Sequence, residues 1–216
     1  EAMTGATTCR PAWTVYLYAA ASVGGILASL VLICCGLWPY GYGALLAHYR
    51  DASPFAVAWI AFQRGVMWSE MAGDPERGRA FYEEAVARLP AYVAAQVHLA
   101  ELEFAAGETA EAIGRLDAIR DETEDPEPLA RLAQFTEASA PDAARAHAAQ
   151  ATLRYRALLD RYREAFLDHA AEFFMAAGAD PRFALELAQE NLALRQTDRA
   201  YLLAIQAARK GVRRAR

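Results

Sequence analysis

The chain has 216 residues, 55% of them hydrophobic, and a formal net charge of −5 at pH 7. This length can bury the core of one domain and carry an appendage besides. The acidic balance argues against a general role in nucleic-acid binding, because that affinity rests on neutralising phosphates. All three cysteines (Cys9, Cys34 and Cys35) lie near the N-terminus, so the rest of the chain has no disulfide framework and no thiol nucleophile.

The N-terminal stretch predicts a membrane anchor. After a short polar tail at 1–12, residues 13–38 contain no Asp, Glu, Lys or Arg, and Trp and Tyr flank both ends. The most apolar part would be about 31 Å long as a helix, which matches a hydrocarbon core of roughly 30 Å, and the aromatic flanks are typical of membrane interfaces. We predict a transmembrane helix at 13–38. The alternatives are a cleaved signal peptide, whose apolar region is usually shorter, and a buried core helix.

Small residues recur on one face of the predicted span. Ala21, Gly25 and Ser29 are spaced four residues apart, an arrangement that lets a neighbouring membrane helix approach closely. We expect helix packing at this face, although Gly and Ala are also common in membrane helices in general. Topology stays open, because Arg10 on one flank balances Arg50 on the other.

A juxtamembrane connector at 39–53 leads into a predicted helical domain at 54–208. Ser53-Pro54 has the form of an N-cap followed by proline at the first helical position. The first helix, about 54–71, is unusually apolar, whereas the end of a repeat array normally carries a polar outer face. We expect its extra apolar surface to dock on the membrane interface or on a membrane partner. The alternative is that the preceding loop folds back over it as a cap.

Turn residues then recur at a fixed period. Gly73-Asp74, Gly107-Glu108 and Pro141-Asp142 follow one another at intervals of 34 residues, and each pair ends one helical run and begins the next. A period near 34 residues is typical of a helix-turn-helix repeat. Small and large apolar residues keep this register over two periods, at Gly78, Tyr82, Ala85 and Pro90 and then at Leu99, Ala100, Ala112 and Leu116.

The segment from Gly73 to Gly107 resembles a tetratricopeptide repeat (TPR), on its Gly-Asp turn, its alanines, Tyr82 and Pro90. The resemblance implies an all-α solenoid, and the register predicts about four repeats and a capping helix that begins near residue 197. Inward-facing side chains are expected on the second helix of the third repeat, about 142–162, and on the capping helix. They are Leu153, Tyr155, Leu158, Leu159 and Tyr162 on the former, and Tyr201, Leu202 and Ile205 on the latter.

Two charged stretches lie outside this pattern. The acidic run at 117–127, opposed only by Arg120, is expected to form a solvated turn before a helix that starts near Pro126 and Pro128. Residues 209–216 form a predicted basic tail. Two interpretations of this tail stay open. It contacts anionic lipid headgroups or an acidic neighbour, or it is a solvated chain end.

The resemblance also implies a groove lined by the first helix of each repeat. The chaperone-binding members of the family hold a C-terminal carboxylate with Lys and Asn at two groove positions, and this chain has neither residue there. Met, Phe and carboxylates suit an apolar or basic helix or extended peptide instead. The ligand-facing positions of the family, carried over to this chain, predict a partner-binding groove made of Gln63, Met67, Met71, Val97, Glu101, Phe104, Arg131, Phe135, Asp168 and Glu172.

No catalytic constellation is visible in the sequence. His98 with Glu101, and His169 with Glu172, are three residues apart, but di-metal sites in helical bundles place Glu before His at this spacing. Neither a Gly-rich phosphate loop nor a nucleophile motif occurs. We therefore predict no catalytic residue, no metal, no cofactor and no small-molecule substrate.

Together these features predict a non-catalytic, membrane-anchored interaction scaffold that is an accessory subunit or assembly factor of a membrane protein complex. The expected partners are integral membrane proteins and membrane lipid, and not nucleic acid. The resemblance to bacterial membrane-anchored TPR proteins implies a single-pass protein of the inner membrane, with the periplasm as the favoured side. The alternatives are a periplasmic chaperone-like module near the translocon, and an enzyme or sensor with a helical active site.

Overall fold

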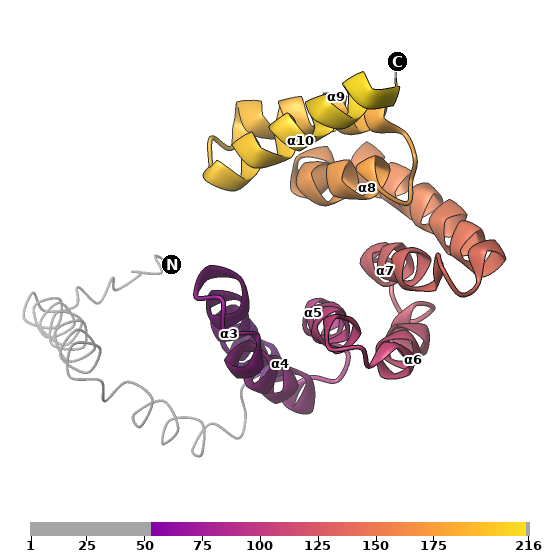
Figure 1. The fold of residues 1–216 in the computed structure, drawn as a ribbon. Helices are drawn as coiled ribbons and strands as arrows, with labels where there is room; N and C mark the ends of the chain where they lie inside the picture. Colours follow the sequence, from indigo (N-terminus) through magenta and orange to yellow (C-terminus); the bar gives the residue numbers. More distant parts are fainter. Residues whose placement is uncertain (1–52, 215–216) are drawn as a thin grey trace, which may run out of the picture. The chain divides into compact units, whose positions relative to one another are not determined.

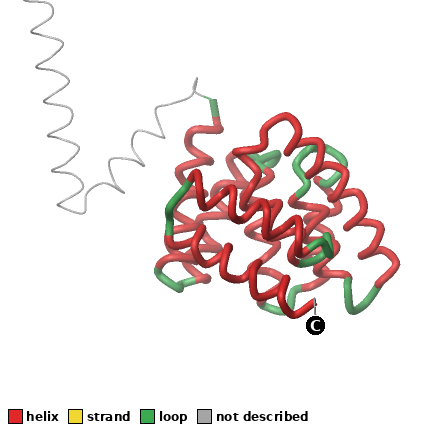
Figure 2. The backbone as a smooth tube through the Cα atoms, turned by 90° about the horizontal axis from the view of Figure 1, so that it is seen from above, coloured by secondary structure: helices red, strands yellow, loops and turns green. Residues whose placement is uncertain are grey.

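The computed structural model describes the backbone of residues 53–214 and the side chains of residues 53–211. This part of the chain consists of helices and loops without a strand (Figure 2), and residues from Pro54 onwards form one compact unit. Its elements are α3 (Pro54–Val66), the π-helical segment η1 (Met67–Met71), α4 (Pro75–Arg88), α5 (Val93–Ala105), α6 (Thr109–Ile119), α7 (Glu127–Thr136), α8 (Pro141–Met175), α9 (Pro181–Leu194) and α10 (Asp198–Arg214).

The helices pack in chain order, as in a solenoid. Each helix from α3 to α10 packs against the next along the chain, and α5 also contacts α7 (Figure 1). Three apolar clusters follow one another along the array and are built from the interfaces between these neighbours. Such an array is quasi-one-dimensional, because each repeat is stabilised mainly by the repeats beside it. The predicted all-α solenoid is confirmed for the described residues.

The predicted turns end and begin the helices through identifiable backbone chemistry. Gly73 and Gly107 have φ values of +68° and +87°, a left-handed conformation that glycine adopts without steric cost. Asp74 caps α4 by accepting the backbone N–H of Arg77 at 3.0 Å. Asp180 caps α9 in the same way, and both helices begin with proline.

The residues that carry the repeat register lie in the core. Small residues occur where paired helices cross, and larger ones fill the space between pairs. Those at most 2% exposed include Tyr82, Ala85, Leu99, Ala100, Ala112 and Leu116.

A very close crossing joins α3 to α4 at Gly65. A β-carbon at Gly65 would lie 2.4 Å from the ring of Tyr82, which is 1% exposed. The Tyr82 hydroxyl lies 2.8 Å from the Ser69 hydroxyl, which donates to the Gly65 carbonyl at 2.9 Å. The hydrogen bond fixes the hydroxyl end of Tyr82, and the backbone at Gly65 packs against its ring. The ring therefore cannot move aside for a larger residue at position 65.

Helix α8 corrects the prediction for the third repeat. It contains the second helix of that repeat and the first helix of the next, and Tyr162 interrupts it with φ −140° and ψ 45°. Leu153 and Tyr162, expected to face inward, are 71% and 59% exposed, whereas Tyr155 is fully buried. Residues two apart on a helix point to nearly opposite sides, so Leu153 cannot share the face of Tyr155. Tyr162 lies at the kink, outside regular helical geometry.

Helix α10 differs from the prediction in register and in length. The expected inward-facing residues Tyr201, Leu202 and Ile205 are 49%, 58% and 48% exposed. The face packed on α9 and α8 is instead made of smaller or differently placed residues, namely Ala200, Leu203 and Ala207. The helix continues to Arg214, so residues 209–214 of the predicted basic tail are helical.

The predicted membrane segment lies outside the described residues. This applies to the span at 13–38, to its small-residue face at Ala21, Gly25 and Ser29, and to residues 39–52 of the connector. Within residues 53–214, no helix is both long enough and apolar enough to cross a bilayer.

The Gly65–Tyr82 crossing predicts the stability of two glycine variants. Gly65→Ala should lower the free energy of unfolding by about 1–3 kcal/mol, because the added methyl group overpacks a ring that cannot move. Gly114→Ala is the matched control on α6, since nothing lies within 4 Å of its β-carbon position. It should stabilise the protein by about 0.5–1 kcal/mol through backbone entropy. Urea unfolding measures both changes, and equal effects at the two positions would contradict the tight crossing.

Candidate functional site

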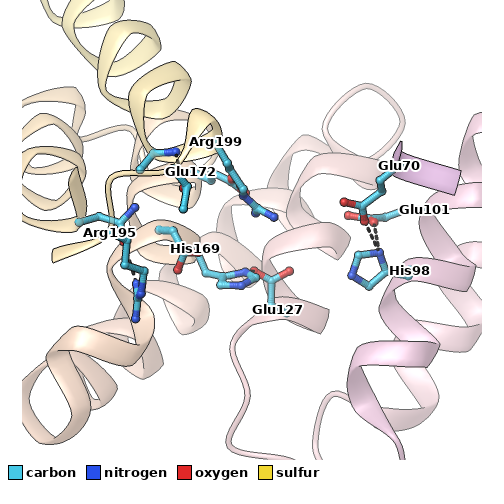
Figure 3. A network of polar contacts seen from close by, with 12 residues as sticks. Glu70, His98, Glu101, Glu127, His169, Glu172, Arg195 and Arg199 are labelled. Carbon is cyan, nitrogen blue, oxygen red and sulfur yellow. Dashed lines mark hydrogen bonds and ion pairs between the residues drawn. The ribbon is translucent and has the colours of Figure 1, made fainter. Parts of the chain in front are cut away.

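A network of charged side chains connects the first helices of successive repeats (Figure 3). We call this set of residues the polar network. It draws on η1, α5, α7, α8 and α10, elements that come from almost the whole length of the array. Its members are Glu70, His98, Glu101, Glu127, Arg131, His169, Glu172 and Arg199.

The α5 side of the polar network is centred on His98. Its Nδ1 atom lies 3.4 Å from a Glu70 oxygen and 3.5 Å from a Glu101 oxygen, and its ring packs against Phe62 and Tyr82. Burial lowers the pKa of His98, although the Glu70 charge acts in the opposite direction. A neutral imidazole is therefore the dominant form at neutral pH, and its single N–H can be donated to either carboxylate.

Glu127 is the centre of the α7–α8 side. Its carboxylate accepts the Tyr155 hydroxyl at 2.8 Å and lies 3.0 Å from Nδ1 of His169, and Arg131 lies 3.5 Å away. Burial would raise the pKa of Glu127, but the His169 hydrogen bond and the Arg131 charge outweigh burial and lower it to about 2. The hydrogen bond to Glu127 raises the pKa of His169 to about 9 in spite of burial. At neutral pH the pair is ionic.

Two arginines join these halves to each other and to α10. Arg131 Nε lies 2.5 Å from a Glu101 oxygen, which links α7 to α5. Arg199 on α10 lies 3.0 Å from Glu172 on α8. Burial lowers the pKa of Arg199, but the charge and the hydrogen bond of Glu172 outweigh burial and raise it, with smaller effects of the Asp168 and Glu70 charges.

The loop before α7 places Glu127. Arg154 on α8 donates to the backbone carbonyls of Arg120 and Thr123, each at 2.8 Å, and Asp125 accepts the backbone N–H of Glu127 at 2.9 Å. The expectation of a solvated acidic turn was wrong for Glu127, whose side chain is only 16% exposed. The local signal was its position between Pro126 and Pro128 at a helix start. Nothing in the sequence marked Tyr155 or His169 as its partners.

A small cavity adjoins the polar network. Its volume is about 160 Å³, below the roughly 300–1,000 Å³ of typical small-molecule sites and enough for one side chain. Carboxylates, imidazoles and a phenol face apolar groups across it. The lining residues are Ala94, Val97, His98, Asp125, Glu127, Tyr155, Phe166 and His169.

The residues predicted to form the partner groove fall into three groups. Glu101, Arg131 and Glu172 belong to the polar network, and Asp168 lies beside it, accepting the backbone N–H of His169. Val97 and Phe135 are 3% and 6% exposed core residues, with Phe104 stacked on Phe135 at a ring-centroid distance of 4.0 Å. The exposed members are Gln63, Met67 and Met71, the last of them 80% exposed.

The two His-Glu pairs weighed as metal ligands have other partners in the structure. His98 and Glu101 lie together, but Glu101 is also paired with Arg131. His169 is paired with Glu127, and Glu172 is paired with Arg199. Across the described side chains, no group of three or more His, Cys, Asp or Glu residues is arranged to hold a metal ion.

Comparison with known families identifies the repeats. The family model of the tetratricopeptide repeat matches residues 71–135, a stretch that includes α4 to α7 and the Gly73–Gly107 period. This part of the chain is therefore a tetratricopeptide-repeat region. Such repeats are typical of protein–protein interaction modules, and protein partners are the class of ligand that the match indicates. A search of curated proteins finds no match to the chain.

The Glu127–His169 pair predicts a window of pH-dependent stability. The His169 pKa is raised from 6.5 to about 9, so its contribution is complete below about pH 6.5 and is lost as pH rises through about 9. The Glu127 pKa is lowered from 4.5 to about 2, so its contribution is complete above about pH 4.5 and is lost as pH falls through about 2. The pair should stabilise the fold most between these limits, less strongly than in a dry site because the His169 side chain is 42% exposed.

Replacing Glu127 tests this assignment directly. In Glu127→Gln, the pKa of His169 should fall towards its ordinary value, as measured by NMR titration of the imidazole. His147, which lies beside Arg120 rather than Glu127, is the internal control and should titrate as before. An unchanged His169 titration would mean that another group holds its proton.

Proposed function

We propose that this protein is a membrane-anchored scaffold without catalytic chemistry, which binds a segment of a partner protein along the first helices of its repeats. In this role it is an accessory subunit or assembly factor of a membrane protein complex. The polar network is the observation that carries the proposal, because side chains from η1, α5, α7, α8 and α10 converge in it. The tetratricopeptide-repeat match at residues 71–135 supports a protein ligand.

The charges of the polar network favour a basic or apolar partner segment. Its four glutamates face two arginines and the protonated His169, and Asp125 and Asp168 lie nearby. An excess of negative charge attracts a basic segment and repels an acidic one. Met67 and Met71 add flexible apolar surface at the η1 end, where they are 46% and 80% exposed, and methionines adapt to ligands of varied shape.

The membrane anchor in this proposal is the predicted span at 13–38, with Ala21, Gly25 and Ser29 packing against an integral membrane partner. Helix α3 supports a position near a membrane. It begins directly after the connector and exposes Phe55 and Trp59, which are 52% and 47% accessible. Aromatic residues are enriched at membrane–water interfaces, and tethering raises the effective concentration of a weakly bound partner. A single-pass protein of the bacterial inner membrane with a periplasmic domain fits this arrangement.

Site-specific photo-crosslinking tests the partner surface. A benzophenone amino acid at Met67 or Met71 should give one discrete adduct with a partner protein in native membranes. The matched control is Leu153, which is 71% exposed on α8 and lies outside the predicted groove, and should give none. Purification in mild detergent gives a second readout. A monomer without a stoichiometric partner would contradict the proposal that the protein is a stable accessory subunit.

Two alternatives give different results in the same experiments. A chaperone-like module near the translocon would crosslink to many unfolded clients rather than to one protein. An enzyme or sensor is favoured by one observation, the cavity lined by His98, Tyr155 and His169, because an active site needs a convergent polar cluster. Replacing His98, Glu101, His169 and Glu172 together tests this alternative, and retained function in the cell would remove it.

A further inference from the structure

The outer face of α10 carries large apolar side chains. Tyr201, Leu202 and Ile205 lie opposite the packed face of the helix and are each about half exposed, at 49%, 58% and 48%. At these spacings the three side chains share one side of the helix. They form a continuous apolar stripe, which we call the α10 stripe.

Basic residues follow the α10 stripe along the same helix. Arg209 and Lys210 are exposed, and the helical backbone continues through Arg213 and Arg214. The first turn holds the single acidic residue of the helix, Asp198. A helix with an apolar stripe and a basic end is typical of segments that lie in the interface of an anionic membrane.

A hollow at the basic end of α10 combines apolar and basic groups. Its volume is about 640 Å³, and it is lined by Met175, Ala176 and Pro181 together with Arg209 and Lys210. Guanidinium and ammonium groups bind phosphate oxygens through charge-assisted hydrogen bonds. The apolar lining can contact the glycerol and first methylene groups of a lipid, so the hollow offers complementary contacts to both parts of an anionic phospholipid.

We propose that α10 docks on an anionic phospholipid bilayer, with the α10 stripe entering the interface and Arg209 and Lys210 binding lipid phosphate. A bilayer fits better than an acidic protein, because it presents phosphates directly above an apolar layer along the whole helix. A protein partner would need an apolar groove with a matching acidic rim. This surface is separate from the polar network, so the inference does not depend on the partner-binding function.

Vesicle flotation with residues 54–216 tests the proposal without the predicted span. This part is a compact unit, and its three core clusters are made of its own residues. It should float with phosphatidylcholine vesicles that contain about 30 mol% phosphatidylglycerol and not with phosphatidylcholine alone. Raising the salt concentration to about 0.5 M should weaken binding, because salt screens surface charge. Inorganic phosphate at equal ionic strength should compete no better than chloride.

Two sets of variants separate the charged and apolar contributions. Arg209→Glu with Lys210→Glu should lower partitioning by about 30-fold or more, given the usual gain per basic residue near an anionic surface. Tyr201→Ser, Leu202→Ser and Ile205→Ser together should abolish flotation at low and high salt. Circular dichroism checks that each variant keeps its helices, which is expected because all of these side chains are exposed.

Matched controls come from exposed residues elsewhere. Arg145→Glu with Arg182→Glu makes the same charge change at side chains that are 71% and 92% exposed, and Leu153→Ser removes an apolar side chain that is more exposed than those of the α10 stripe. Both controls should float nearly as the parent does. The proposal is overturned by no binding to anionic vesicles, by equal binding to neutral vesicles, or by equal losses in the controls. It is also overturned by capture of an acidic protein in the absence of vesicle binding.

Discussion

The close crossing of paired helices is the constraint on which the rest of the structure depends. Helices such as α3 and α4 approach each other through positions with little or no side chain, and the ring of Tyr82 lies only 2.4 Å from the position that a β-carbon at Gly65 would take. Fully buried alanines serve the same purpose in later pairs, at Ala112 and Ala184. Because this packing face is set in every pair, the positions of the other side chains on each first helix are also set. Those side chains include the charged residues of the polar network, one of which, His98, packs against Phe62 and Tyr82.

The polar network adds a second kind of constraint to the apolar one. A buried carboxylate such as Glu127 is costly unless it is neutralised and hydrogen-bonded. Tyr155, His169 and Arg131 supply those partners from α8 and α7. The interface between these helices is therefore specified by charge as well as by shape, and loss of one partner leaves the others uncompensated. A site of this kind can hold its geometry while a ligand lies against it.

The parts of the fold that follow from local geometry could be predicted from the sequence. Gly73, Asp74 and Gly107 act within a few residues of themselves, and the sequence predicts their turns. The centre of the site could not be predicted in this way. Tyr155 and His169 lie 28 and 42 residues from Glu127, on the two segments of α8 that the kink at Tyr162 separates. The wrong predictions on α8 and α10 have another cause, because the apolar character of a residue does not give its angle around the helix.

Packing between neighbours also bears on how the chain acquires its structure. Most helix contacts join elements that are adjacent in sequence, and such local contacts close quickly at small entropic cost. The α3–α4 pair contains its own buried aromatic contact between Phe62 and Tyr82, so it can form while later helices are still being synthesised. The Glu127–His169 pair must wait until 42 further residues have been added. During synthesis, the N-terminal repeats can therefore pack first, and the polar network is completed only when α8 and α10 have been made.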